Sequence, residues 1–153
     1  MSEEIYNNYK NGKISKKEAV QSMQDMADFS NSRIIIKSAL ENLSKIHADL
    51  FDYFKDFALT HEDQTIRETA FKILIINYSV KSSEFIRYVI DHWNTTRTLL
   101  LIHEVLCLNI PFMLEEYKEE YQQIKQQIED KFKRHTSLPI ESVKKSVRFK
   151  YAV

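Results

Sequence analysis

Glycine and proline are scarce in this sequence, which has one glycine and two prolines among its 153 residues. Tight β-hairpins depend on residues that tolerate positive φ, and glycine is the main one. Phosphate-binding loops and the GxSxG turn of hydrolases need several glycines at fixed spacing. The composition therefore excludes a turn-rich β protein and these loop-based nucleotide and hydrolase sites, and we expect an all-α protein.

Cysteine and long apolar runs are scarce as well. Cys107 is the only cysteine, so an intrachain disulfide or a thiolate cluster for zinc cannot form. It lies in the apolar run 106–108, where we expect it to pack as a small hydrophobic side chain. The apolar run 99–102 is far too short to cross a bilayer, and the first residues lack the hydrophobic core of a signal peptide. We therefore expect no membrane association and a cytoplasmic location.

The charges of the chain balance, with 22 basic and 22 acidic residues. A balanced chain creates no global field that would attract nucleic acid or an anionic membrane surface. With 43% apolar and 29% charged residues, the composition is typical of a folded globular domain with a hydrophobic core.

The residues that could carry chemistry form no recognisable constellation. No two of the five histidines are four residues apart, the spacing of a helix-borne metal pair. His103 and Glu104 are adjacent, so on a helix their side chains point about 100° apart. The acidic segment 115–120 lacks the Glu-x-x-His motif of ferritin-like metal sites. We expect no catalytic residue, no metal and no cofactor.

Apolar residues recur at spacings of three and four along most of the chain, as on amphipathic helices. Ser15 with Glu18 forms a capping box at a helix start, and Asn31 and Ser32 can cap the next helix. The pattern predicts helices over residues 1–11, 15–29, 33–46, 49–59, 82–93, 97–108 and 112–134, and one that begins at Thr65.

Three arginines follow polar breaks and precede apolar helical stretches. Arg33, Arg67 and Arg97 are 34 and 30 residues apart. Self-similarity at this period is typical of stacked helical hairpins, in which each unit buries its apolar face against its neighbours. The sequence therefore predicts a short α-solenoid of about three hairpins over residues 16–110, followed by a long helix.

The middle hairpin carries the pattern Asp63-x-x-Ile66-Arg67-x-x-Ala70 at the start of its second helix. This pattern resembles the Asp-x-x-Val-Arg-x-x-Ala signature of HEAT repeats. The resemblance implies that Asp63 and Arg67 bond between adjacent repeats, and that the second helix of each hairpin lines a concave surface. In the third hairpin, a register based on Arg97 would bury Glu104. A register shifted by one residue moves Glu104 outward, and we prefer it because a buried carboxylate is costly.

The end of the chain has a different pattern. We expect one helical-repeat domain over residues 1–135, and a linker with an extended C-terminal tail over 136–153. From residue 147 apolar and other side chains alternate, as on a β-strand, and the segment 138–153 carries four basic residues and one acidic residue. The tail could dock on its own domain, add a strand to a partner, or be disordered. The tail residues expected to bind a partner are Val147, Phe149, Tyr151 and Val153.

These features favour a non-catalytic scaffold or adaptor that binds another protein through the concave face of the solenoid or through the tail. Helical repeats suggest this class by analogy only. Self-association through the 113–134 helix or the tail is a further expectation. The alternative is a nucleic-acid-binding helical-repeat module, and a small enzyme is a third reading. The face residues expected to bind a partner are Lys37, Glu41, Lys45, Lys72 and Arg97.

Overall fold

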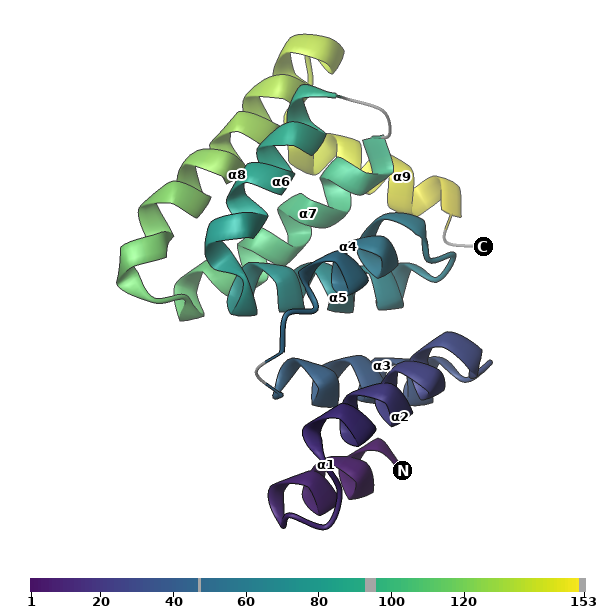
Figure 1. The fold of residues 1–153 in the computed structure, drawn as a ribbon. Helices are drawn as coiled ribbons and strands as arrows, with labels where there is room; N and C mark the ends of the chain where they lie inside the picture. Colours follow the sequence, from purple (N-terminus) through teal and green to yellow (C-terminus); the bar gives the residue numbers. More distant parts are fainter. Residues whose placement is uncertain (47, 93–95, 152–153) are drawn as a thin grey trace. The chain divides into compact units, whose positions relative to one another are not determined.

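The structure is a computed structural model, and it describes residues 1–46, 48–92 and 96–151, the last six of these as backbone only. All regular secondary structure in these ranges is helical, which confirms the all-α prediction (Figure 1). The chain divides into two compact units, residues 1–78 and 79–153. No helix in the described ranges combines the length and the apolar character that crossing a membrane requires. The single domain expected over residues 1–135 stays a prediction.

The first unit contains five helices, and two helical hairpins follow a short first helix. The helices are α1 (Ser2–Lys10), α2 (Lys16–Phe29), α3 (Arg33–Ser44), α4 (Phe51–Thr60) and α5 (Gln64–Asn77). The pairs α2/α3 and α4/α5 form the hairpins, α3 packs on α5, and α1 packs on both α2 and α3 (Figure 1). Tyr53 on α4 donates a hydrogen bond to Asp28 on α2 at 2.8 Å, so the first helices of the two hairpins are joined as well.

Polar side chains begin three of these helices. Ser15 accepts a hydrogen bond from the Glu18 amide at 3.1 Å, which confirms the predicted cap of α2. Ser32 accepts from the Ile35 amide at 3.4 Å at the start of α3. The start predicted at Thr65 is wrong by a short distance, because Asp63 is the N-cap of α5. A carboxylate there binds the free amides of the first turn and also favours the positive end of the helix.

The core of the first unit consists of the apolar stripes that the sequence predicts. Leu40, Phe54 and Leu74 are fully buried, and so are Ala39 and Ala70, whose small side chains leave room for the neighbouring helix. Aromatic side chains at the start of α4 pack against Tyr78 at ring-centroid distances of 6.0 Å. Burial of these side chains stabilises the hairpins, because helices of this length are marginal in isolation.

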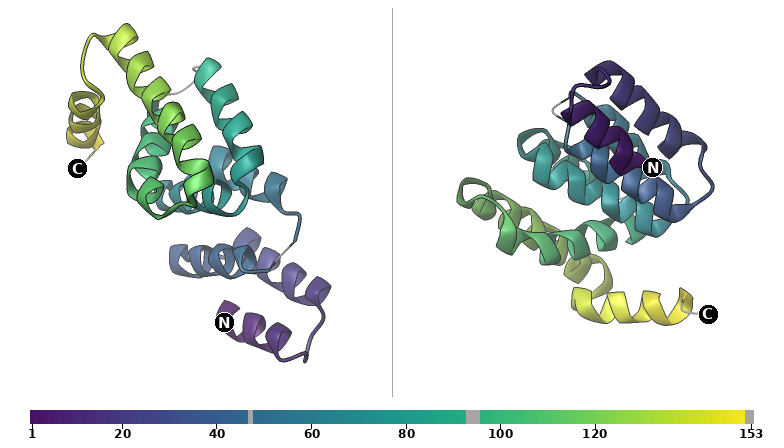
Figure 2. Two further views of the ribbon diagram at one scale, coloured as in Figure 1. Left: turned by 90° about the vertical axis from the view of Figure 1, so that its left-hand side faces the viewer. Right: turned by 90° about the horizontal axis from the view of Figure 1, so that it is seen from below.

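The second unit is built around its longest helix. It contains α6 (Ser79–Asp91), α7 (Thr96–Asn109), the 3-10 helix η1 (Ile110–Phe112), α8 (Glu115–Thr136) and α9 (Ile140–Tyr151). Both α6 and α7 pack against α8, which also contacts η1 and α9 (Figures 1 and 2). The Arg87 guanidinium lies 2.8 Å from a Glu120 carboxylate oxygen, and the Lys131 ammonium donates to the Ile90 carbonyl. The two helices of the third expected hairpin, α6 and α7, therefore both pack against α8.

The extended tail predicted after residue 136 is wrong where the structure describes it, because residues Ile140–Tyr151 form helix α9. The Pro139 carbonyl accepts hydrogen bonds from the amides of Ser142 and Val143, which closes the first turn. Ile140 and Val143 are buried and three residues apart, the spacing of one helix face. The alternation that suggested a strand begins only at residue 147, and a local helical stripe precedes it.

Candidate functional site

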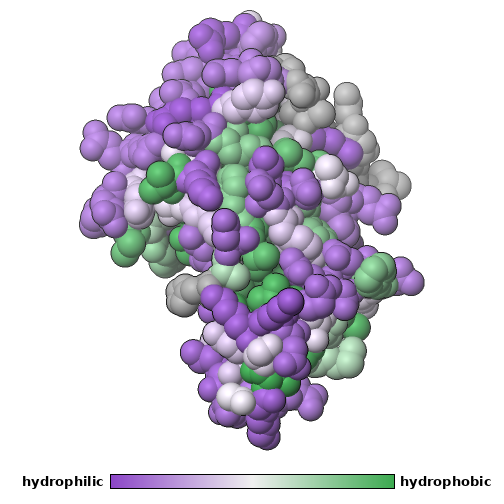
Figure 3. Space-filling model, viewed as in Figure 1, coloured by the Kyte–Doolittle hydropathy of each residue, from purple (hydrophilic) through white to green (hydrophobic). Residues whose placement is uncertain are grey.

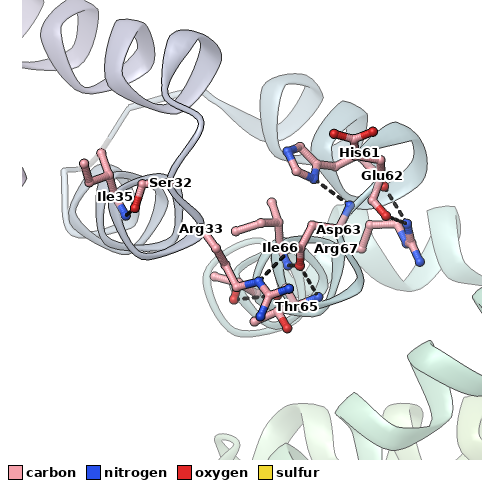
Figure 4. Close-up of polar contacts among 10 residues, drawn as sticks. Ser32, Arg33, Ile35, His61, Glu62, Asp63, Thr65, Ile66 and Arg67 are labelled. Carbon is pink, nitrogen blue, oxygen red and sulfur yellow. Dashed lines mark hydrogen bonds and ion pairs between the residues drawn. The ribbon is translucent and has the colours of Figure 1, made fainter. Parts of the chain in front are cut away.

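Helices α3 and α5 lie side by side and run in the same direction. At their N-terminal ends, Arg33 Nε lies 2.6 Å from Asp63 Oδ2 (Figure 4). At their C-terminal ends, the Asn77 side-chain amide donates to the Ser44 carbonyl at 2.9 Å. Because each end of α3 is joined to the same end of α5, the two helices form a parallel pair with a fixed register.

Asp63 links the two hairpins and also begins α5. Its other carboxylate oxygen accepts from the amides of Thr65 at 2.8 Å and Ile66 at 3.3 Å (Figure 4). Burial raises the pKa of Asp63, but the hydrogen bonds from Arg33 and these two amides outweigh it and hold the pKa below its usual value. The carboxylate therefore stays ionised at neutral pH and keeps all three bonds.

Arg67 has a more local role than the resemblance to HEAT repeats implies. Its guanidinium donates to the carbonyls of His61 at 2.5 Å and Glu62 at 3.2 Å (Figure 4). Both acceptors belong to the turn between α4 and α5. Asp63 therefore bonds to the preceding hairpin, as the resemblance implies, whereas Arg67 bonds within its own hairpin.

The parallel pair carries an exposed surface, which we call the α3/α5 face. We give this name to six exposed residues of the two helices, four of which the sequence singled out and two of which, both isoleucines, it did not. Lys37 and Glu41 approach within 3.9 Å, and Lys45 donates to the Asn42 side chain at 3.2 Å. The residues of the face are Ile34, Lys37, Glu41 and Lys45 on α3, and Lys72 and Ile76 on α5.

The two isoleucines are the part of the face that sequence reasoning missed. Ile34 is 80% exposed and Ile76 is 42% exposed. The signal was available, because Ile34 shares the spacing of three and four residues with Lys37 and Glu41 and is off the buried stripe. Exposed isoleucines among charged side chains are a composition found at protein interfaces, whereas a purely solvating face needs only polar residues.

A hollow lies at the C-terminal ends of the same two helices. Its volume is about 390 Å³, and Lys45, Ile46, Asn77 and Tyr78 contribute to its wall. The Tyr78 hydroxyl donates to the Ala48 carbonyl at 3.0 Å, and burial raises the pKa of this tyrosine. The hollow is thus a recess at the C-terminal end of the α3/α5 face, large enough for a side chain.

The remaining predicted binding residues do not lie on this face. Arg97 is exposed on α7, in the second unit. Val147, Phe149 and Tyr151 lie in the part of α9 whose side chains are outside the described residues, and Val153 is outside the described chain altogether. Their proposed role in binding stays a prediction.

The second unit contains a buried polar cluster that the sequence did not predict. His103 is 1% exposed, and its Nε2 lies 2.8 Å from a Glu129 carboxylate oxygen on α8. The Cys107 sulfur, one turn along α7, lies 3.6 Å from His103 Nδ1. The next residue along α7, Glu104, accepts from the ammonium of Lys144, on α9, at 2.9 Å.

The electrostatics of this cluster favour a structural role over nucleophilic chemistry. Burial lowers the pKa of His103, and it outweighs the opposite effect of the Glu129 hydrogen bond. Burial also raises the pKa of the Cys107 thiol. An activated cysteine needs the reverse shifts, because the thiolate is the nucleophile and a protonated imidazole stabilises it. Within the described ranges no three His, Cys, Asp or Glu residues are placed to hold a metal ion.

Comparison with protein-family models, with curated proteins and with solved structures finds no match for this chain. No known protein therefore adds to the resemblance to HEAT repeats that the sequence motif carries.

Proposed function

We propose that this chain is a non-catalytic scaffold or adaptor that binds another protein through the α3/α5 face. The observation that carries the proposal is the exposed surface of a parallel helix pair with a fixed register, which carries charges of both signs, with Ile34 at its N-terminal end and Ile76 at its C-terminal end. Protein–protein interfaces combine exposed apolar side chains with polar and charged ones. Because the helix pair is already folded, binding does not cost the entropy of ordering this surface.

The charges on the face favour a protein over a nucleic acid. Lys37 is already close to Glu41, and the half-buried Glu68 lies one helical turn before Lys72 on α5. A phosphate backbone is bound by a track of basic residues without interspersed carboxylates, and each phosphate contact makes affinity more dependent on salt. Because the face also carries exposed lysines, a nucleic-acid-binding module is the alternative function.

The fold supports the proposal through its likeness to stacked helical repeats. Two hairpins joined at both ends of their second helices are the arrangement that builds extended binding surfaces in solenoid proteins. The Arg33–Asp63 contact between the hairpins agrees with the inter-repeat role that the HEAT resemblance implies for Asp63. The neutral Cys107–His103 pair supports the non-catalytic part of the proposal.

Site-specific photo-crosslinking tests the proposal. A photoreactive residue at Lys72 on the face, and one at the exposed Lys17 on α2 as the matched control, are compared in an extract of the native host. We expect a protein adduct at position 72 that is missing at position 17. A salt titration with generic DNA and RNA completes the test, and steeply salt-dependent binding with no specific protein adduct would favour the alternative.

A further inference from the structure

The connection between α7 and α8 exposes three large apolar side chains within seven residues. Leu108 is 57% exposed, Phe112 is 84% exposed and Leu114 is 67% exposed. In Figure 3, apolar side chains gather where α7 is followed by α8, beside hydrophilic ones. Single exposed apolar residues are common on protein surfaces, but a cluster of this kind marks an interaction site.

The three exposed side chains lie close together along the chain, on three successive elements of backbone. Leu108 is in the last turn of α7, and Phe112 is the last residue of the η1 turn that directly follows it. Met113 has an extended backbone with φ −75° and ψ 159° and is buried. Met113 is therefore a buried residue between two exposed apolar ones, Phe112 and Leu114.

Carboxylates adjoin this apolar strip. The first two turns of α8 carry Glu115, Glu116, Glu119 and Glu120 against a single Lys118. Lys118 is bound to Glu115 at 2.8 Å, and Glu120 is bound to Arg87 at 2.8 Å. Glu116 and Glu119 are exposed and make no ion pair with the described residues. Acidic residues in a first turn stabilise a helix, but this does not account for Glu119 or for the exposed strip.

We propose that this strip is a docking surface for a basic amphipathic helix of a partner protein, independent of the α3/α5 face. The partner's apolar stripe would cover Leu108, Phe112 and Leu114, and its lysines or arginines would meet Glu116 and Glu119. An amphipathic helix presents its apolar anchors on one face, and charge complementarity sets its orientation and the rate of association. The same carboxylates repel an anionic membrane surface.

A synthetic helical peptide tests the surface on the full chain. The probe has leucines at positions i, i+3, i+4 and i+7 and lysines elsewhere. Its controls are the same apolar pattern with glutamates and a shuffled sequence of equal composition. We expect the basic amphipathic probe to bind in the micromolar range and both controls to bind at least about tenfold more weakly by fluorescence anisotropy. Equal binding of the acidic or the shuffled peptide would overturn the proposal.

Paired variants locate the binding. F112S/L114S is expected to weaken the probe at least about tenfold, and E116Q/E119Q to weaken it less and flatten its salt dependence. The matched controls, Val80→Ser and Glu84→Gln, change an exposed apolar and an exposed acidic residue of the same unit and should leave the affinity within about twofold. Unchanged binding by both test variants, or an equal loss of affinity in the control variants, would contradict the proposal.

Sedimentation of the full chain tests whether a second copy is the partner instead. A dimer that becomes a monomer in F112S/L114S would assign the strip to contacts between two copies of this chain.

Discussion

The Arg33 guanidinium and the Asp63 carboxylate, 30 residues apart in sequence and 2.6 Å apart in space, join the two hairpins of the first unit. The same carboxylate caps α5 through the amides of Thr65 and Ile66. One side chain thus fixes both the start of a helix and its position against the neighbouring hairpin. The α3/α5 face depends on this register, since the face is shared between the two helices.

The two roles of Asp63 can be separated by substitution. Asp63→Ala removes the cap and the ion pair, and it should lower the free energy of unfolding by about 0.5–2 kcal/mol, the range for a lost N-cap. Asp63→Asn keeps a capping oxygen and should cost less, because an exposed ion pair contributes about 0–1 kcal/mol. Urea unfolding of both variants checks the order. An asparagine as costly as alanine would show that the ion pair, and not the cap, dominates.

The assignment of helix faces in the first unit predicts a large difference between buried and exposed positions. Leu40→Ala or Leu74→Ala empties a fully buried site and should cost about 2–5 kcal/mol in the free energy of unfolding. Lys37→Ala or Lys72→Ala should change it by less than about 0.5 kcal/mol, because both lysines are exposed. Chemical denaturation followed by circular dichroism measures both sets, and the reverse order would mean that the faces are wrongly assigned.

Burial of His103 makes the second unit sensitive to acid. The pKa of His103 is lowered in the folded state, so the unfolded chain binds a proton that the folded chain does not. The free energy of unfolding therefore falls as the pH drops below the unfolded pKa of about 6.5, until the pH reaches the folded pKa. Unfolding of the native chain and of His103→Gln between pH 7.5 and 5 checks this, and the variant should have a flatter slope.

A matched control for the acid sensitivity is His92→Gln, because His92 is exposed on the turn that follows α6. This variant should keep the slope of the native chain, since His103 is still in place. If His103→Gln and the native chain lose stability equally on acidification, His103 is not the group responsible.

Two neighbouring lysines test how α9 is held. Lys144 is buried and bonded to Glu104, whereas Lys145 is exposed. Lys144→Met should reduce the hydrogen-exchange protection of α9 amides about tenfold or more, because a hydrogen bond to a charged group contributes about 1.5–3 kcal/mol. Lys145→Met should leave the protection nearly unchanged. Equal effects would mean that apolar burial of Ile140 and Val143 alone holds the helix.

Most of the helical architecture could be predicted from the sequence, because it follows from local patterns. Helix α2 begins where the Ser15 capping box places it, and the buried stripe of α3 contains Ile36, Leu40 and Leu43 as its spacing predicts. On α7 the residues Leu99, Ile102 and Leu106 are buried as the shifted register predicts, and His103 is buried as well. Each of these features depends on residues within one or two helical turns.

The parts that the sequence did not predict depend on residues far apart in the chain. The partners His103 and Glu129 are 26 residues apart, and Glu104 and Lys144 are 40 residues apart. No local pattern encodes such pairs, because they form only when α8 and α9 pack on α7. The strand predicted near the chain end is wrong for a local reason, because two patterns in neighbouring residues disagree. The alternation from residue 147 is short, whereas the spacing of Ile140 and Val143 just before it is helical.

The most direct test of the α3/α5 face is the affinity of the purified chain for the partner protein identified by cross-linking at position 72. Isothermal titration compares the native chain with Ile34→Asp and with Phe29→Asp, a matched change at an apolar residue on α2 that is 79% exposed. We expect Ile34→Asp to weaken binding at least about tenfold and Phe29→Asp to leave it within about twofold. Native affinity in Ile34→Asp, with folding intact by circular dichroism, would contradict the account.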